Sequence, residues 1–284
     1  MTAPVSYRRD ESVAVITLND GKVNALGPAM QQAINAALDT ADRDDVGALV
    51  IAGNERVFSG GFDLKVLTSG ETGAAIDMLR GGFELAYRLL SYPKPVVMAC
   101  TGHAIAMGAF LLCSGDHRVA APAYNIQANE VAIGMTLPYA ALAILQLRLT
   151  PSAYQQAVGL ANTFFGETAV AAGWLDEIVL PDAVLTRAVD APASSVACTA
   201  APMPLANCGP GRPGWRRCAP GSTASKPSSR SRVWLAAWLA AWRTSRRRAC
   251  VHGIESAFRA LRLRWRHRDC VQGIETVLAA PRLH

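Results

Sequence analysis

The chain has 284 residues, of which 51% are hydrophobic, and a formal net charge of +6. This length and composition suit a globular protein of one large or two small domains and exclude a chain too polar to form a core. The N-terminus lacks a basic stretch followed by an apolar core, and no apolar run reaches the roughly 18 residues that span a bilayer, so we expect a cytoplasmic protein.

The first fifty residues alternate strand and helix patterns. Val13–Leu18 is β-branched and apolar, and the turn sequence Asn19–Lys22 follows it, which predicts a hairpin or a strand and turn. Pro28–Leu38 has apolar residues at helical spacing, so we predict a helix that ends before the acid-rich loop Asp39–Asp45. Val46–Gly53 is almost wholly apolar, as expected of a strand covered on both faces.

The segment Pro93–Ala120 combines a strand, a turn and a helix with almost no spacer. Val96–Ala99 is a short β-branched run, Thr101–Met107 is small and flexible, and an apolar helix is predicted to begin near Met107. The first N–H groups of such a helix have no partner inside it and favour negative charge. Ser59–Phe62 is a second turn of small residues. Backbone N–H groups from the two turns together could hold an oxyanion, whereas close strand-helix packing explains either turn alone.

The remaining segments continue the pattern. We predict four further helices, over 71–91, Tyr139–Leu149, Ser152–Gly159 and Thr168–Gly173, and Thr150 is a candidate N-cap between the second and the third. We also predict strands over Val119–Ile126 and Leu175–Leu180, and a turn over Asn129–Gly134. The alternation favours an α/β fold with right-handed crossovers. Cys100 and Cys113 lie in apolar runs and are interpreted as core residues of a reducing compartment, and no metal-ligand spacing occurs among Cys and His.

Four stretches in order carry a resemblance to a known family: Asn24-Ala25-Leu26, Phe58–Lys65, Pro93–Ala120 and Ala172–Val179. Over residues 5 to about 190 the chain resembles the enoyl-CoA hydratase/isomerase family, the crotonases. The resemblance implies an α/β crotonase-like fold, a spiral of ββα units with an acyl-CoA site. It also implies that the backbone N–H groups of Phe62 and Met107 hold the thioester oxygen. Two preorganised donors stabilise that oxygen more strongly as enolate charge develops on it.

The same resemblance implies the substrate contacts. Lys22, Lys65 and the backbone near Ala25 and Leu26 match positions that hold the CoA phosphates and adenine, although each lysine is equally compatible with a solvated surface charge. Other expected substrate-binding positions lie in and after the two turns: Gly60, Gly61, Asp63, Gly108 and Phe110. CoA is part of the substrate, so neither a separate cofactor nor a metal is expected. A homo-trimer or hexamer is expected as in the family.

Acid and base residues decide which reaction is expected. Family hydratases use two glutamates; Glu130 matches one, and Phe110 stands at the position of the other. Hydration needs an activated water and a proton delivered to C2, whereas isomerisation of a 3-enoyl to a 2-enoyl thioester can use one carboxylate. We therefore expect isomerase-type proton transfer in fatty acid metabolism by Glu130. The alternatives are a hydratase of beta-oxidation and an inactive acyl-CoA-binding protein. Glu130 could instead be a surface acid, and His103 is interpreted as a turn residue rather than a base.

The region after residue 190 departs from the family pattern. Residues 1–190 carry 12 Lys and Arg against 19 Asp and Glu, a balance of −7, whereas residues 191–284 carry 16 against 3, a balance of +13. Five of the seven cysteines and five of the six tryptophans also lie after residue 190. We therefore divide the chain into a crotonase-like acyl-CoA-binding core, residues 1–190, and an atypical basic tail, residues 191–284.

Two hypotheses account for the tail. The first hypothesis is a shift of reading frame near residue 190, because GC-rich codons for Gly221–Ser229, read one base off, can encode Ile-Asp-Gly-Ile-Glu-Ala-Glu-Phe. This hypothesis predicts a poorly ordered tail. The other is a basic arm in which Arg243 and Arg246–Arg248 contact phosphates or anionic lipid, with Trp234, Trp238 and Trp242 on one helix face. No nucleic-acid motif occurs, so we expect no nucleic-acid partner. No apolar run is long enough to cross a bilayer, so we expect no membrane span.

Overall fold

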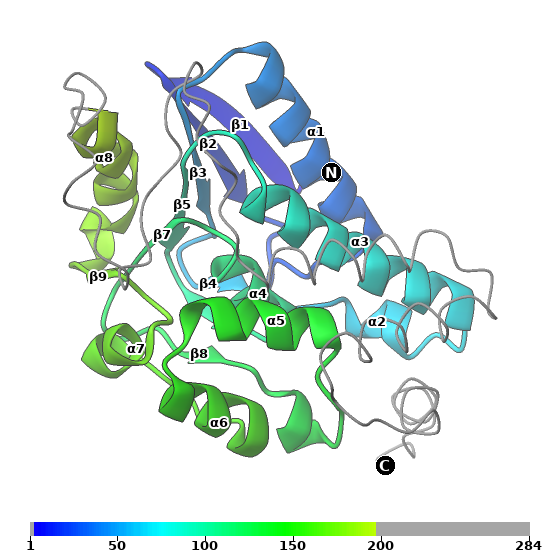
Figure 1. Cartoon of the computed structure of the whole chain (residues 1–284). Helices are drawn as coiled ribbons and strands as arrows, with labels where there is room; N and C mark the ends of the chain where they lie inside the picture. The colour runs from blue at the N-terminus through cyan, green and yellow to red at the C-terminus, as the bar shows by residue number, and fades with distance from the viewer. Residues whose placement is uncertain (1–2, 197–284) are drawn as a thin grey trace, which may run out of the picture.

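The computed structural model describes residues 3–196, and the predicted tail after residue 196 lies outside the described residues (Figure 1). Two sheets form its centre, a larger one in the order β1-β2-β3-β5-β7-β9 and a smaller one in the order β4-β6-β8. Their strands are β1 (Val5–Asp10), β2 (Val13–Leu18), β3 (Ala48–Ala52), β4 (Val57–Ser59), β5 (Val96–Cys100), β6 (His103–Ile105), β7 (His117–Ala120), β8 (Ile126–Gln127) and β9 (Glu177–Ile178).

The predicted spiral of ββα units is confirmed by the way the strands are shared. Three successive pairs, β3 with β4, β5 with β6 and β7 with β8, each give their first strand to the larger sheet and their second to the smaller one. All pairings within the two sheets are parallel except the hairpin of β1 and β2, in which Asp10 faces Val13. The ends of the strands in each pair therefore recur at one side of the molecule, where the connecting turns meet.

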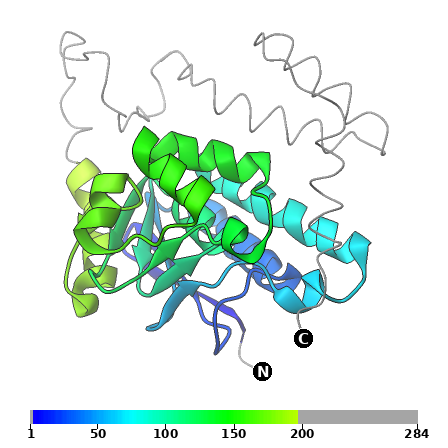
Figure 2. The same ribbon diagram turned by 90° about the horizontal axis from the view of Figure 1, so that it is seen from below.

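Helices cover both faces of the larger sheet (Figure 1). They are α1 (Pro28–Arg43), α2 (Leu64–Leu67), α3 (Thr72–Leu90), α4 (Met107–Leu112), α5 (Tyr139–Arg148), α6 (Pro151–Leu160), α7 (Gly166–Ala172) and α8 (Val184–Val196), with 3₁₀ turns η1 (Glu130–Ile133) and η2 (Pro181–Ala183). Figure 2 shows α5 and α6, both green, side by side.

The two faces of the sheet have separate cores because strand side chains alternate. On one face Ile16 and Ile51 pack with α1, α3 and the wholly buried α4. On the other, Val15 and Val50 pack with Ala188 of α8. Every residue of β3 is buried, which confirms the strand predicted to be covered on both faces. Cys100 and Cys113 are also buried as predicted, and burial raises the pKa of the Cys100 thiol to about 12.

Several predicted bounds were wrong. The helix that begins at Pro28 does not end at Leu38, because Arg88 of α3 pairs with Asp39 and Asp42 at 2.6 and 3.2 Å and extends the packed face of α1 to Arg43. The segment 119–126 is two strands of different sheets, and the segment 175–180 holds only the two-residue β9. Neither β1 nor α8 was predicted.

Other predicted elements are confirmed. The Thr150 hydroxyl caps α6 by accepting from the Ala153 N–H, and α7 ends at Gly173, whose φ is +92°. The predicted boundary at residue 190 falls inside α8, and residues 197–284 are not described, so the division into core and tail stays a prediction.

Candidate active site

The first turn of small residues follows β4 and is held by the segment between β2 and α1. The Gly60 N–H donates to the carbonyl of Val23 at 2.8 Å, and the Leu26 N–H donates to the carbonyl of Gly61 at 2.7 Å. Gly61 has φ +94°, a conformation that favours glycine. The Phe62 N–H, next in the chain, has no hydrogen-bond acceptor within residues 3–196.

The second turn joins β6 to α4. Ala106 has φ 51° and ψ −125°, an unusual conformation for alanine, and its N–H donates to the carbonyl of Gln127 at 2.8 Å. Met107 is the first residue of α4, as predicted, and its N–H likewise finds no acceptor in the described part of the chain. The strained residue is thus directly followed by an unpaired backbone donor.

The two turns pack directly on each other. A Cβ atom on Gly61 would lie 3.3 Å from the backbone nitrogen of Met107, and one on Gly108 would lie 2.2 Å from the carbonyl oxygen of Ser59. Larger residues at either glycine would force the turns apart. The unpaired N–H groups of Phe62 and Met107 therefore belong to backbone segments in van der Waals contact, as two donors to one oxyanion require.

Glu130 lies beyond β8, three residues after the carbonyl that holds Ala106. It begins the 3₁₀ turn η1 and is 8% exposed. Its Oε2 atom is buried without a hydrogen-bond partner among the described residues, and burial raises the pKa of its carboxyl from an ordinary 4.5 to about 7. Glu130 is the one buried carboxylate in the described part of the chain, so its interpretation as a surface acid is wrong.

Phe110 lies one turn of α4 after Met107 and is 1% exposed. Its ring stacks on Phe83 of α3, with centroids 6.3 Å apart and planes at 20°. Phe83 in turn packs edge-on against Phe62, with centroids 6.1 Å apart. At the position that the sequence resemblance matches to the other glutamate of family hydratases, this chain has the end of an aromatic row, Phe62, Phe83 and Phe110.

The lysines predicted to bind CoA phosphates, Lys22 and Lys65, are both exposed, and neither forms an ion pair within residues 3–196. Lys22 adjoins Val23, which receives the Gly60 N–H, so one lysine flanks the first turn. Lys65 lies in α2, three residues after Phe62. Their positions are compatible with substrate binding, which stays a prediction.

Other predicted binding positions have visible structural roles. Asp63 caps α2 by accepting from the Lys65 N–H at 2.9 Å, and the Ala25 N–H donates to the Asp20 carboxylate at 3.0 Å. The Leu26 side chain is fully buried. His103 lies in β6 and is exposed; its Nδ1 accepts from the Asn125 N–H at 2.9 Å, which supports its interpretation as a structural residue.

Asn24 is the residue whose role the sequence analysis missed. It is completely buried with φ 51°, and its side-chain nitrogen donates to the carbonyls of Leu18, Val57 and Phe58 at 3.0, 3.1 and 3.2 Å. Its own carbonyl accepts from the Ser59 hydroxyl at 2.8 Å. Asn24 thus ties β2 to β4 and supports the first turn. A lone amide in an otherwise apolar motif was the available signal.

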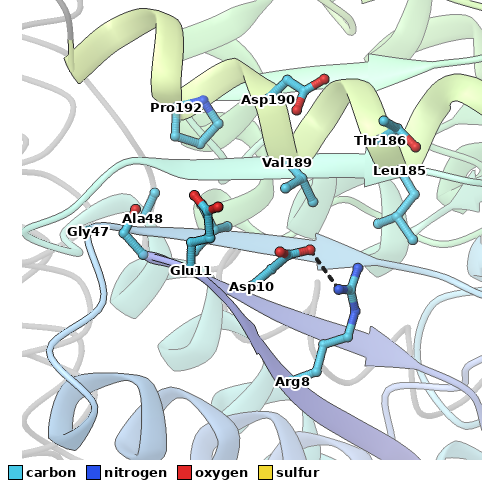
Figure 3. A pocket seen from close by; sticks show the side chains of 12 residues that line it. Arg8, Asp10, Glu11, Gly47, Ala48, Leu185, Thr186, Val189, Asp190 and Pro192 are labelled. Atoms are coloured by element: carbon cyan, nitrogen blue, oxygen red, sulfur yellow. Dashed lines mark hydrogen bonds and ion pairs between the residues drawn. The ribbon is translucent and has the colours of Figure 1, made fainter.

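A groove of about 560 Å³ opens elsewhere, between the β1–β2 turn, the start of β3 and α8 (Figure 3). Its polar lining includes Arg8, Asp10, Glu11 and Asp190. It lies at the amino ends of β2 and β3, whereas the two turns lie beyond the carboxyl ends of β4 and β6. Open α/β sheets bind their ligands at the carboxyl ends of their strands. We therefore place the candidate site at the turns and not in the groove.

The described residues contain no group of three His, Cys, Asp or Glu side chains placed to hold a metal ion. None of the helices in residues 3–196 is both long and apolar enough to cross a membrane.

Comparison with known proteins agrees with this geometry. The family model for Enoyl-CoA hydratase/isomerase matches residues 8–200. The chain belongs to this family, the crotonases. Crotonases act on acyl-CoA thioesters, and the two turns described above lie inside the matched region.

Among solved structures, the chain is similar to an enoyl-CoA isomerase from Mycobacterium tuberculosis, with 77% identity and a TM-score of 0.66 over 68% of this chain and 84% of that one. A second structure of that same protein, named a probable enoyl-CoA hydratase EchA3, is 80% identical to this chain, with a TM-score of 0.67 over 67% of this chain and 81% of that one. A probable enoyl-CoA hydratase echA17 of Mycobacterium avium is 31% identical over 63% of this chain and 70% of its own. One protein thus carries an isomerase name in one structure and a hydratase name in another.

Proposed function

We propose that this crotonase is an enoyl-CoA isomerase that moves a proton within a 3-enoyl-CoA thioester with Glu130 alone. The observation that carries this proposal is the contrast between the two acid positions. Glu130 is a buried carboxylate with an unpaired oxygen, while Phe110 is closed into the aromatic row. A second carboxylate that activates water has no place at Phe110.

The chemistry needs one base and one oxyanion site. The Glu130 carboxylate takes a proton from C2 of the 3-enoyl thioester, and the electron pair of the broken C–H bond moves onto the thioester oxygen. The N–H groups of Phe62 and Met107 donate to that oxygen as its charge grows. Protonated Glu130 then returns the proton to C4, and the double bond ends between C2 and C3. A carboxyl with a pKa of about 7 suits both halves of this transfer.

In this proposal the remainder of the substrate is held outside the reacting centre. Lys22 and Lys65, both exposed cations, would receive the CoA phosphates, with the backbone near Ala25 and Leu26 receiving the adenine. CoA enters as part of the substrate, and the two steps above involve no further group.

A hydratase is the second candidate, because several similar proteins carry that name. A third is a protein that binds acyl-CoA without turnover. The three differ in a measurable way: isomerase and hydratase activities leave different products, and a binding protein leaves none.

The test is turnover of a 3-enoyl-CoA and of a 2-enoyl-CoA by the wild-type chain and by Glu130→Gln. We expect isomerisation to exceed hydration and to fall by about 10² to 10⁴ in Glu130→Gln while CoA-thioester binding is retained. Glu167→Gln, which changes an exposed acid on α7, is the matched control and should leave both rates unchanged. Wild-type hydration as fast as that of a two-glutamate hydratase would contradict the isomerase assignment.

Phe110→Glu tests whether the absence of a second carboxylate limits hydration. If the missing glutamate limits hydration, this variant should hydrate a 2-enoyl-CoA faster than the wild-type chain. Since Phe110 is buried against Phe83, its folding must be checked by circular dichroism. A folded variant without any gain in hydration would show that Phe110 is not the limiting position.

A further inference from the structure

Helix α3 contains two consecutive glycines, Gly81 and Gly82, in the middle of its 19 residues. Glycine is among the poorest helix formers, so its presence there calls for a local reason. Both glycines lie where another part of the chain touches the backbone of α3. A Cβ atom on Gly82 would lie 2.5 Å from Cε1 and 2.8 Å from Cζ of Phe62, and one on Gly81 would lie 2.3 Å from Oε1 of Gln31.

The Phe62 ring is therefore seated on the helix backbone. Carbon atoms in contact are ordinarily about 3.5 to 4.0 Å apart, so a methyl group at residue 82 would displace the ring by about 1 Å. The edge of Phe83 packs against the same ring. Gly82 and Phe83 together thus define the place of the Phe62 side chain.

The backbone before Phe62 is fixed from the same helix. The Gln31 side-chain nitrogen donates to the carbonyls of Met78 in α3 and of Leu26, both at 2.9 Å. The Leu26 N–H in turn donates to the carbonyl of Gly61 at 2.7 Å. That carbonyl belongs to the same peptide group as the Phe62 N–H, so α3 holds this peptide group through Gln31 and Leu26 and its neighbouring side chain through Gly82.

We propose that Gly82 is a positioning residue for the oxyanion site, because it admits the Phe62 ring against α3 and so fixes the Gly61–Phe62 peptide group. The positional part of this inference rests on the contacts just described, and its kinetic part rests on the proposed function. A shift of the ring that carries the Phe62 N–H with it by about 1 Å lowers turnover by roughly 10², because this donor acts in the transition state.

The first test compares Gly82→Ala with Gly73→Ala. Both changes replace a glycine of α3 by a better helix former, but a Cβ atom on Gly73 would meet nothing within 4 Å. The chain has seven phenylalanines, so ¹⁵N-phenylalanine labelling gives a simple amide spectrum in which loss of a signal in Phe62→Leu identifies Phe62. We expect the Phe62 amide signal to move in Gly82→Ala and to stay in Gly73→Ala.

The kinetic test compares the same two variants. Gly82→Ala should lower kcat for 3-enoyl-CoA isomerisation by about tenfold to a hundredfold while KM changes by less than about threefold, and Gly73→Ala should leave both unchanged. A Phe62 amide signal that does not move, or an equal effect of both variants, would overturn the proposal. If the wild-type chain turns over no enoyl thioester, the proposed function fails, and the amide signal alone decides the positional part.

A Phe62→Leu background tests the contact itself, because leucine lacks the ring atoms that meet residue 82. In that background Gly82→Ala should change kcat by less than about twofold. If Gly82→Ala alone does not fold, recovery of folding in the double variant supports the proposal. A double variant that also fails to fold, or an undiminished effect on kcat, would mean that Gly82 acts through something other than the Phe62 ring.

Discussion

The carboxyl ends of the strands in the smaller sheet and the amino ends of those in the larger sheet differ in what they leave unsatisfied. Beyond the carboxyl ends lie two turns with unpaired N–H groups, the strained Ala106 and the buried Glu130 with an unpaired oxygen. At the amino ends lies the groove of Figure 3, whose Arg8 and Asp10 side chains are about half exposed and paired at 2.7 Å. A hollow alone therefore says less about chemistry than buried groups that the fold holds without partners.

The largest effect is expected at the contact of the two turns. Gly61→Ala puts a Cβ atom 3.0 Å from both the Cβ of Ala106 and the carbonyl oxygen of Ile105, so the turns must separate. We expect kcat to fall by about 10² to 10³, as when an oxyanion donor is lost. Gly70→Ala is the control, because Gly70 has a similar φ of +83° but open space around it. Equal losses in the two variants would point to backbone strain and not to the site.

The protonation of Glu130 should govern the pH dependence of turnover. The base must be ionised, and burial raises its pKa to about 7, so kcat should fall about tenfold for each pH unit below that value and level off above it. The measurement is kcat for isomerisation from pH 5 to 9, with Glu167→Gln as control. A profile of kcat that is flat between pH 5 and 7 would mean that Glu130 is not the base.

The same buried carboxyl should lower stability at alkaline pH. Because its pKa in the folded state lies above the ordinary 4.5, the folded state binds the proton more tightly than the unfolded state does. The resulting contribution to the free energy of unfolding is fully present below pH 4.5 and is lost as the pH rises through about 7. Each pKa unit corresponds to about 1.4 kcal/mol, so Glu130→Gln should stabilise the chain by about 3 kcal/mol more at pH 8 than at pH 4.5. Urea unfolding at both pH values measures this, and a pH-independent difference would contradict it.

The smallest effect is expected in the groove at the amino ends. Arg8→Ala removes an ion pair whose two side chains are about half exposed, so the free energy of unfolding should change by less than about 1 kcal/mol. Turnover should stay at the wild-type value. A clear loss of activity in this variant would mean that the groove takes part in function and that the comparison of the two ends is wrong.

Local patterns predicted most of the fold and part of the site. The apolar run of β3, the start of α4 at Met107 and the Thr150 cap all depend on neighbouring residues, and all are confirmed. The extension of α1 depends on Arg88, about fifty residues away in the chain, and could not be read locally. The contact of the Phe62 ring with Gly82 is likewise a long-range contact, between a turn and helix α3.

The division of the chain at residue 190 stays a prediction. Sequencing the encoding DNA and measuring the intact mass of the natural protein test it. A mass that matches all 284 residues, with a protease-resistant tail, would contradict the frame-shift hypothesis.

The strand order of the larger sheet also fixes an order of assembly. From β1 to β9, each strand of that sheet pairs with the preceding strand of the same sheet, so a chain emerging from the ribosome can add strands at one growing edge. The exposed edge of an incomplete sheet is a template for unwanted pairing. The last edge, β9, is only two residues long. Completion of the sheet thus replaces the four-residue edge of β7 on the nascent chain with the two-residue edge of β9.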